Sequence, residues 1–464
     1  MNRLRWVMDG SSIWEVDVST PTTIDGVARP LAHDGPLPLG LSRGTRLSRP
    51  KQLQFFHKFM ASPFVPCFSP FHGFSLQRSL TLPLSNDWFT SLLGSFDLQK
   101  FYTSVKNAHP SDSSLLQVIG RQLCDKSFYA FGFCSEFLVT SNDTLLVGYE
   151  SREDIKAARK KAVFQHKFPN HNLILEAACP GLFIDKHGKY WDVPVSVAAD
   201  VASVSWDSGA SYHLSLQHIS GSAKAVEGND SGEVPTSLLP GLSLKSAFSF
   251  RKNFDLWRSQ SKKQKLVQPF DVLLSNPHIS ASAVIGAVGT ALLGDNASRP
   301  NVDVEPEGFR RFNLYASGHK SAILGDLFST LSVTAQHGNF QRWFFDLSRI
   351  HLRLDVPSGS KFLSAAACVS QHLYDSKQPP IQAVQAVCPN VTLSLQQQLV
   401  GPFSLRFDST VAVDLKNRDW KNVNLENPVF AIEYALQVLG SAKAIAWYAP
   451  KQKEFMVELR FFER

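Results

Sequence analysis

Four cations between residues 43 and 51 form the sharpest chemical pattern in the sequence. Arg43, Arg46 and Arg49 recur at every third position and Lys51 follows them, with serine and threonine hydroxyls interleaved. A guanidinium group can give two parallel hydrogen bonds to the oxygens of a phosphate, and a neighbouring hydroxyl can give another. The stretch therefore indicates a site for an anionic, phosphate-like group.

An apolar and aromatic group follows these cations at once and consists of Leu53, Phe55, Phe56 and Phe59. Cations beside apolar side chains suit the two parts of a phospholipid, which are its headgroup and its acyl chains. Our hypothesis assigns the four cations to headgroup contact and the apolar group to acyl-chain contact. A solvated basic loop and a strip that docks a protein partner are the alternatives for the same residues.

One catalytic pattern is present, a Gly-x-Ser-x-Gly match at residues 40–44 with Ser42 in the position of a nucleophile. A nucleophile elbow requires a buried strand before the serine, but the preceding residues are proline-rich and do not suit a central strand. No nucleotide phosphate loop and no Cys/His metal-ligand spacing occurs. Three histidines near the basic stretch are expected to be solvated: His33, His57 and His72. We therefore predict no catalytic activity, no cofactor and no metal.

The whole chain of 464 residues carries a net charge of +7, with 44% hydrophobic and 19% charged residues. Two further cationic groups lie at residues 156–161 and 251–265. No nucleic-acid-binding pattern accompanies them, so no nucleic acid partner is expected. Loops at an anionic membrane surface are the expected role of both groups.

From Gly73 onward, apolar and polar residues alternate in repeated short runs. Such runs occupy residues 74–84, 191–201, 211–218, 242–250, 350–356, 391–399, 403–413 and 455–462. Alternation with a period of two indicates strands with one apolar face. Clusters of Asn, Asp and Gly separate the runs, as turns between strands require. We expect residues 191–201 to form one long strand.

Soluble sandwich, solenoid and propeller architectures remain alternatives, but the runs favour a transmembrane β-barrel. Many of them last about 9–11 residues, which is the length that crosses a bilayer at a tilt. Aromatic residues stand near their ends, as in the aromatic girdles of such barrels. The prediction is an all-β fold: a large transmembrane antiparallel β-barrel of roughly 16–20 strands, formed by residues 73–464. Residues 1–72 are expected to form a short irregular N-terminal segment that binds lipid or plugs the barrel.

One segment has the signals of a helix rather than a strand. Ser151 is a suitable N-cap with Asp154 three positions later, and the basic residues 155–162 follow. The sequence therefore predicts a short basic helix over residues 151–162.

The N-terminal sequence resembles a known plant protein family. The resemblance is carried by residues 2–6, 13–14, 19–21, 36–51, 55–57 and 59–63, above all by PLPLGLSRGTRLSRPK at 36–51. On these residues the chain is identified as a member of the trigalactosyldiacylglycerol protein four family. The N-terminus has no apolar secretory core and is too rich in acids for a cleaved transit peptide, which fits insertion into an outer envelope.

The resemblance implies a β-barrel of the chloroplast outer envelope that binds phosphatidic acid. It implies a role in lipid transfer from the endoplasmic reticulum to the plastid for galactolipid synthesis, with endoplasmic reticulum contact sites among the expected locations. The implied partners are phosphatidic acid, membrane lipids and an ABC-type lipid importer complex of the inner envelope. We also expect a homo-oligomer, with a dimer as the first choice. The alternative function is a porin-like solute channel of the outer envelope.

Overall fold

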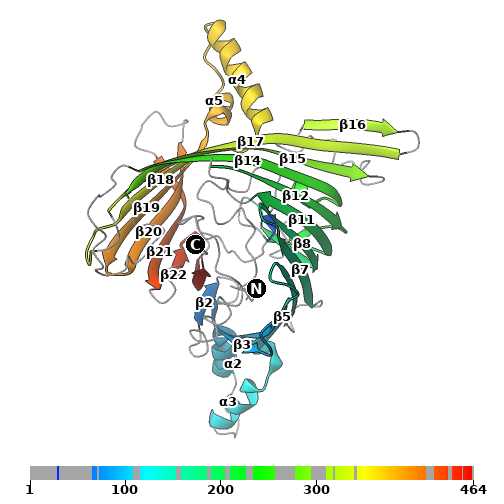
Figure 1. Cartoon of the computed structure of the whole chain (residues 1–464), viewed down its shortest axis with the longest axis vertical. Coiled ribbons are helices and arrows are strands. Elements are labelled where there is room, and N and C mark those ends of the chain that lie inside the picture. Colours follow the sequence, from blue (N-terminus) through cyan, green and yellow to red (C-terminus); the bar gives the residue numbers. More distant parts are fainter. Residues whose placement is uncertain are drawn as a thin grey trace.

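The structure is a computed structural model, and most of the chain from Val65 onward is described in it (Figure 1). The described residues are 29–30, 65–69, 73–107, 115–152, 158–184, 190–203, 209–225, 234–255, 277–293, 310–316, 319–338, 342–413, 423–436, 442–451 and 453–461.

One large antiparallel sheet dominates the fold, which confirms the predicted all-β class. Its strands are β2 (Val65–Ser69), β3 (Gly73–Pro83), β4 (Trp88–Asp97), β5 (Tyr129–Leu138), β6 (Asp143–Arg152), β7 (Arg159–Lys167), β8 (His171–Cys179), β11 (Val195–Ser203), β12 (Ala210–Ser220), β14 (Gly241–Asp255), β15 (His278–Leu293), β16 (Arg310–Ala316), β17 (His319–His337), β18 (Ser348–Val356), β19 (Asn390–Val400), β20 (Phe403–Val413), β21 (Val423–Leu436), β22 (Ala442–Ala449) and β23 (Glu454–Phe461). The sheet begins at Val65, inside the predicted N-terminal segment 1–72; the division of the chain at residue 72 stays a prediction.

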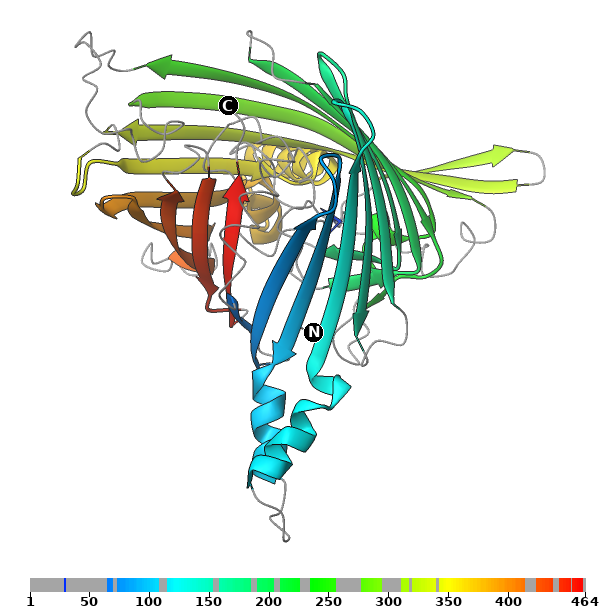
Figure 2. The same cartoon turned by 60° about the horizontal axis from the view of Figure 1, so that its bottom comes forward.

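Most neighbouring strands of the large sheet follow one another along the chain, with exceptions such as the pairs of β8 with β11 and of β15 with β17. The sheet curves round on itself (Figures 1 and 2). Strand β17 is the longest and has β15 on one edge, while β16 and β18 share its other edge. The last strand, β23, returns to β2 through the pair Phe68 and Phe455. Among the described residues, this one pair links the last strand of the series to the first.

The predicted helix over residues 151–162 is wrong. Ser151 lies in β6, and Arg159 to Ala162 lie in β7. Two cations of β7 have partners on other strands. Arg159 contacts Asp192, which lies outside the large sheet, at 2.6 Å, and Lys161 contacts Glu176 on the adjacent strand β8 at 3.2 Å. Pairing across the sheet therefore overrides the helical signal of the local sequence.

The single long strand expected over residues 191–201 is also wrong. Pro194 divides it into β10 (Tyr190–Val193) and β11, because proline lacks the N–H that a continuous ladder requires. Strand β10 belongs to a small sheet with β1 (Arg29–Pro30), β9 (Gly181–Ile184) and β13 (Lys224–Ala225). Strand β1 comes from the predicted N-terminal segment.

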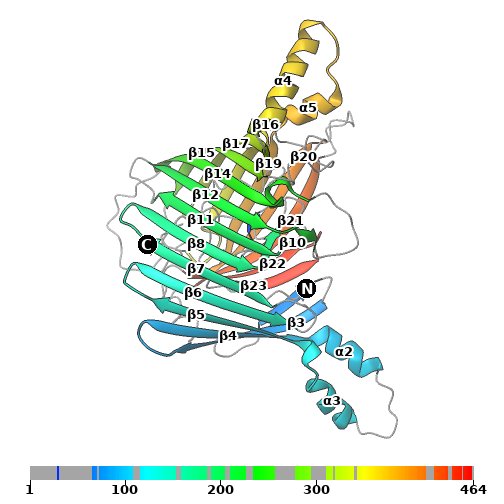
Figure 3. The same ribbon diagram turned by 90° about the vertical axis from the view of Figure 1, so that its right-hand side faces the viewer.

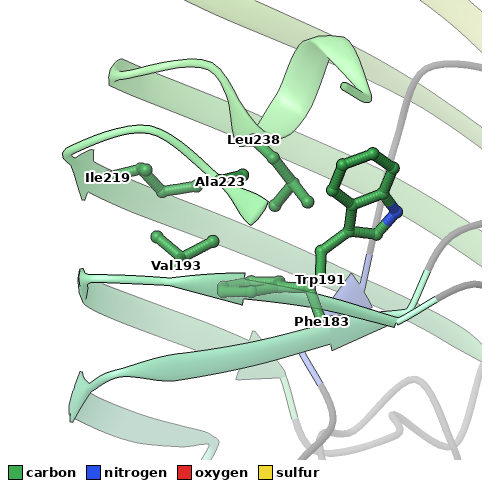
Figure 4. Close-up of a cluster of buried hydrophobic side chains, with 6 residues drawn as sticks. All are labelled: Phe183, Trp191, Val193, Ile219, Ala223 and Leu238. Atoms are coloured by element: carbon green, nitrogen blue, oxygen red, sulfur yellow. The ribbon is translucent and has the colours of Figure 1, made fainter. Parts of the chain in front are cut away.

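The small sheet packs against the buried side of the large sheet through an apolar cluster (Figure 4). Phe183, Trp191 and Val193 come from its β9–β10 hairpin. Ile219 comes from β12 of the large sheet, and Leu238 comes from a short 3-10 helix at Thr236–Leu238. This cluster and the ion pair between Arg159 and Asp192 hold the small sheet at one end of the strands.

In the part of the chain that the structure describes, four α-helices form two hairpins that project from the large sheet. Helices α2 (Leu98–Asn107) and α3 (Leu115–Leu123) connect β4 to β5, while α4 (Gly359–Tyr374) and α5 (Ile381–Val387) connect β18 to β19. None of the helices in the described part of the chain has the length and apolar character needed to cross a membrane.

The two ends of the strands differ, since connections in an antiparallel series alternate between them. One end carries short turns at 84–87, 139–142, 168–170 and 401–402. The other end carries both helical hairpins and the connections that contain β9, β10 and β13. In Figure 3 the α4–α5 hairpin stands at the top of the view and the α2–α3 hairpin at the lower right. We call these the turn end and the insertion end.

Candidate functional site

The residues predicted to bind lipid lie outside the described residues. This applies to the headgroup candidates Arg43, Arg46, Arg49 and Lys51 and to the acyl-chain candidates Leu53, Phe55, Phe56 and Phe59. Ser42 lies outside them as well. These assignments stay predictions, and the site that the structure does describe is formed by the two faces of the large sheet.

The outer face of the large sheet, which we define by its exposed side chains, is apolar. Ile285 on β15 is 64% exposed and Ile350 on β18 is 53% exposed. Other members of this face are Leu80, Leu92, Phe131, Phe133, Leu214, Leu244, Phe248, Leu327, Leu331, Val333, Leu352, Leu405, Phe430 and Ile432. Exposed apolar patches beyond a few hundred Å² are rare on soluble monomers. A face that is apolar on strand after strand therefore requires an apolar environment.

The inner face, which we define by the buried side chains of the same strands, is largely polar. Strand β18 shows the alternation clearly, because Arg349, His351 and Arg353 are buried while Ile350 and Leu352 between them are exposed. A soluble sheet has the reverse pattern, with its apolar side chains buried. The sheet is thus inverted relative to a water-soluble protein.

A buried ionic network occupies the inner face of β19, β20 and β21. The Arg406 guanidinium is 1% exposed and donates to Asp408 at 2.6 Å and to Glu433 at 3.0 Å. The Gln396 amide donates to Glu433 at 3.1 Å and to Ser404 at 3.1 Å. Buried charges are stable only when opposite charges and hydrogen bonds surround them, so this network fixes three strands together.

A second polar group continues this network onto β17 and β18. Arg353 contacts Asp355 at 2.9 Å, and the Thr330 hydroxyl donates to the same carboxylate at 2.7 Å. Thr334 and the His351 ring are hydrogen-bonded at 2.9 Å. The inner face therefore presents a polar sector that reaches from β17 to β21.

An apolar sector lies beside the polar one. Val429 and Ala431 on β21 form a buried cluster with Ile445, Trp447 and Ala449 on β22. The register places both sectors in one row across the sheet: Gln336, Arg349, Gln396, Arg406, Ala431 and Trp447. A wall with a polar sector beside an apolar one offers separate surfaces to the polar and apolar parts of an amphipathic molecule.

These inner-face residues are not among the sites predicted from the sequence. The signal was present, because charged residues recur at every second position opposite the apolar phase, as in Arg353 with Asp355 and Arg406 with Asp408. Which charges meet depends on strand register, and a single sequence does not give it. Among the described residues, no group of three or more His, Cys, Asp or Glu side chains could hold a metal ion.

Comparison with known proteins identifies the family. No family model matches the chain. A curated Arabidopsis thaliana protein, Protein TRIGALACTOSYLDIACYLGLYCEROL 4, chloroplastic, is 53% identical to it over 481 aligned residues, which cover 100% of both chains. The chain belongs to the TRIGALACTOSYLDIACYLGLYCEROL 4 family.

The resemblance seen in the first 63 residues is thereby confirmed, and it extends over the whole length of the chain. Both faces of the large sheet lie in the part that aligns with the TRIGALACTOSYLDIACYLGLYCEROL 4 protein of Arabidopsis thaliana.

Proposed function

We propose that the protein is a phosphatidic acid-binding β-barrel of the chloroplast outer envelope. In this proposal it takes part in lipid transfer from the endoplasmic reticulum to the plastid for galactolipid synthesis, and it acts without catalysing a reaction. The observation that carries the proposal is the inverted sheet, with exposed apolar side chains over a buried polar face. The name of the Arabidopsis thaliana relative, which refers to a galactolipid and to the chloroplast, supports the pathway and the organelle.

The proposed mechanism separates anchoring from headgroup capture. The apolar outer face contacts the acyl chains of the outer envelope, and the polar inner face stays away from them. Arg43, Arg46, Arg49 and Lys51 bind the phosphate of phosphatidic acid, while Leu53, Phe55, Phe56 and Phe59 contact its acyl chains. Phosphatidic acid can approach two negative charges on a small headgroup, so clustered cations distinguish it from zwitterionic lipids. The lipid then passes to an ABC-type importer complex of the inner envelope, and the protein acts as a dimer.

A vesicle-binding series tests the headgroup assignment. Changing Arg43, Arg46, Arg49 and Lys51 together to glutamine is expected to weaken binding to vesicles that contain phosphatidic acid by more than about tenfold, since each cation near an anionic surface contributes about 1 kcal/mol. Binding is measured by flotation with the full-length protein, and vesicles of phosphatidylcholine alone give the background.

The control removes charge from two exposed cations at the turn end, Lys167 and Arg342, which lie away from the insertion end. This control should bind phosphatidic acid vesicles nearly as well as the unchanged protein. Equal losses in the two variants would mean that net charge alone is responsible, and the headgroup site would have to be placed elsewhere.

The alternative function is a porin-like solute channel, and the polar inner face is the observation that favours it. An open aqueous pore exposes its lining, however, whereas Gln336, Arg406 and Glu433 on the inner face are buried. We expect no stepwise conductance when the purified protein is added to a planar bilayer. Regular single-channel steps that persist at several salt concentrations would favour the channel over the lipid-transfer proposal.

A further inference from the structure

The helix α4 starts from a fixed base on the large sheet. Ser358 is its buried N-cap, and the Ser358 hydroxyl accepts a hydrogen bond from the Lys361 N–H at 3.2 Å. Asp326 on β17 accepts a hydrogen bond from the Ser358 hydroxyl and one from the Ser360 N–H at 3.0 Å. These bonds fix the direction in which α4 leaves the sheet.

The exposed side of α4 is uncharged and carries large apolar side chains among small and polar ones. Leu363 is 62% exposed and Tyr374 is 90% exposed. Leu363, Ala367, Ser370 and Tyr374 lie at helical spacing, so they form one stripe along the helix. Leu373 beside this stripe and Ile381 at the start of α5 are also exposed. In water this hairpin would expose apolar surface without any compensating contact within the described residues.

The apolar surface of α4 continues from the outer face of the large sheet. A Cβ built on Gly359, the first residue of α4, would lie 3.1 Å from the Cβ of Leu327 on β17. Leu327 is 56% exposed and belongs to the outer face. The same apolar environment that covers the outer face therefore reaches the base of α4.

Charge distinguishes a lipid surface from other partners. None of the sequences of α2, α3, α4 and α5 contains an aspartate or a glutamate. Their cations are Lys100 and Lys106 on α2, Arg121 on α3 and Lys361 on α4. Both hairpins lie at the insertion end, and they point away from the sheet to opposite sides in Figure 3. Helices that lack acidic residues and lie at the same end of the strands suit the anionic headgroup layer of a single membrane surface.

We propose that the α4–α5 hairpin lies in the membrane surface at the insertion end, with the stripe of α4 at the boundary between headgroups and acyl chains. The occupant of the stripe is the phospholipid of the membrane that the large sheet crosses. This inference rests on the proposed membrane insertion of the large sheet, and it adds a second, interfacial contact that sets the depth of the insertion end.

Depth-dependent quenching tests the inference on the full-length protein reconstituted into vesicles of phosphatidylcholine and phosphatidylglycerol. The six native cysteines are replaced, and one environment-sensitive fluorophore is attached to a new cysteine at Leu373, at Ile350 or at Ser141. Ile350 reports on the outer face, and Ser141 lies in a described turn of the turn end. Brominated lipids carry the quencher either near the headgroups or deep in the acyl chains.

The expected result is a different depth for each probe. At Leu373 quenching should be stronger with bromine near the headgroups than with bromine deep in the acyl chains, because interfacial helices bury their apolar face roughly 5–10 Å below the surface. With the shallow bromine, quenching at Leu373 should exceed quenching at Ser141 by about twofold or more. At Ile350 quenching should be strongest with deep bromine. An added Leu363→Asp substitution should reduce quenching at Leu373 and leave quenching at Ile350 unchanged.

Other outcomes separate this inference from the proposed function. Quenching at Ile350 with none at Leu373 would overturn the interfacial hairpin and leave the membrane-spanning sheet intact. No quenching at Ile350 would overturn the membrane-spanning sheet, and the hairpin proposal with it. The fluorophore at position 373 could be shielded from water in vesicles but not in nanodiscs that hold one chain each. That result would show that a second copy of the chain, and not lipid, covers α4, and it would also overturn the proposal.

Discussion

Replacing Arg406 with methionine is expected to lower the free energy of unfolding by about 3–5 kcal/mol, because it leaves buried carboxylates without their cation. Asp408 and Glu433 are both buried beside Arg406, and the methionine can fill space but cannot donate to either. The free energy of unfolding of Arg406→Lys should lie between that of the unchanged protein and that of Arg406→Met. An ammonium group keeps the positive charge but lacks the fork that reaches two carboxylates at once. The loss should appear as a lower urea midpoint for the protein folded in lipid vesicles.

Lys377→Met is the matched control for this prediction. Lys377 contacts Asp375 at 3.8 Å, but both side chains are largely exposed, and such surface pairs contribute about 0–1 kcal/mol. The control should therefore unfold at nearly the same urea concentration as the unchanged protein. A midpoint for Arg406→Met that equals that of Lys377→Met would show that the inner-face network does not stabilise the sheet.

Replacing Leu352 with arginine is expected to cost about 2–4 kcal/mol if the outer face contacts acyl chains, as arginine does on the lipid face of membrane barrels near the bilayer midplane. Leu352 stands in the middle of β18, is 40% exposed and pairs with Val333 and Leu393 on the two neighbouring strands. On a surface that faced water, the same change would alter stability by no more than about 0.5 kcal/mol. The sign and size of the effect thus distinguish the two environments.

The measurement is the fraction of protein that folds into vesicles, followed by protection from added protease. Ser141→Arg is the control, because it adds the same charge in an exposed turn at the turn end. Leu352→Arg should fold poorly while Ser141→Arg folds normally. Normal folding of both variants would place the outer face in water and contradict the membrane-spanning sheet.

The sequence was sufficient to predict the all-β class, because the alternation that it shows is the alternation of exposed and buried side chains in the strands. Strand β18 is an example, since the run over residues 350–356 predicted both its existence and its two faces. The incorrect predictions concern two short segments. Residues 151–162 have helical signals, yet Arg159 and Lys161 find their partners on other strands, and Pro194 divides a run whose apolar phase continues through it.

The inner-face site was harder to predict than the fold. Arg406 and Glu433 are 27 positions apart, and they meet only because β20 and β21 pair in one particular register. The two apolar residues that complete the row, Ala431 and Trp447, carry no chemical signal in the sequence. Charged residues recur on the polar phase of these strands, but which of them pair with one another required the structure.

The link between β2 and β23 makes one joint of the large sheet weaker than the others. β2 has only five residues and contains Pro66, which cannot donate a backbone hydrogen bond, whereas β14 and β15 pair from Leu242 to Asp255. Within the residues that the structure describes, separating β2 from β23 therefore breaks fewer hydrogen bonds than separating any pair of long strands. If the large sheet spans a bilayer, as we propose, parting these two strands would join the inner wall to the acyl chains through a sideways opening. An amphipathic molecule that moved between them would meet its smallest barrier at that seam.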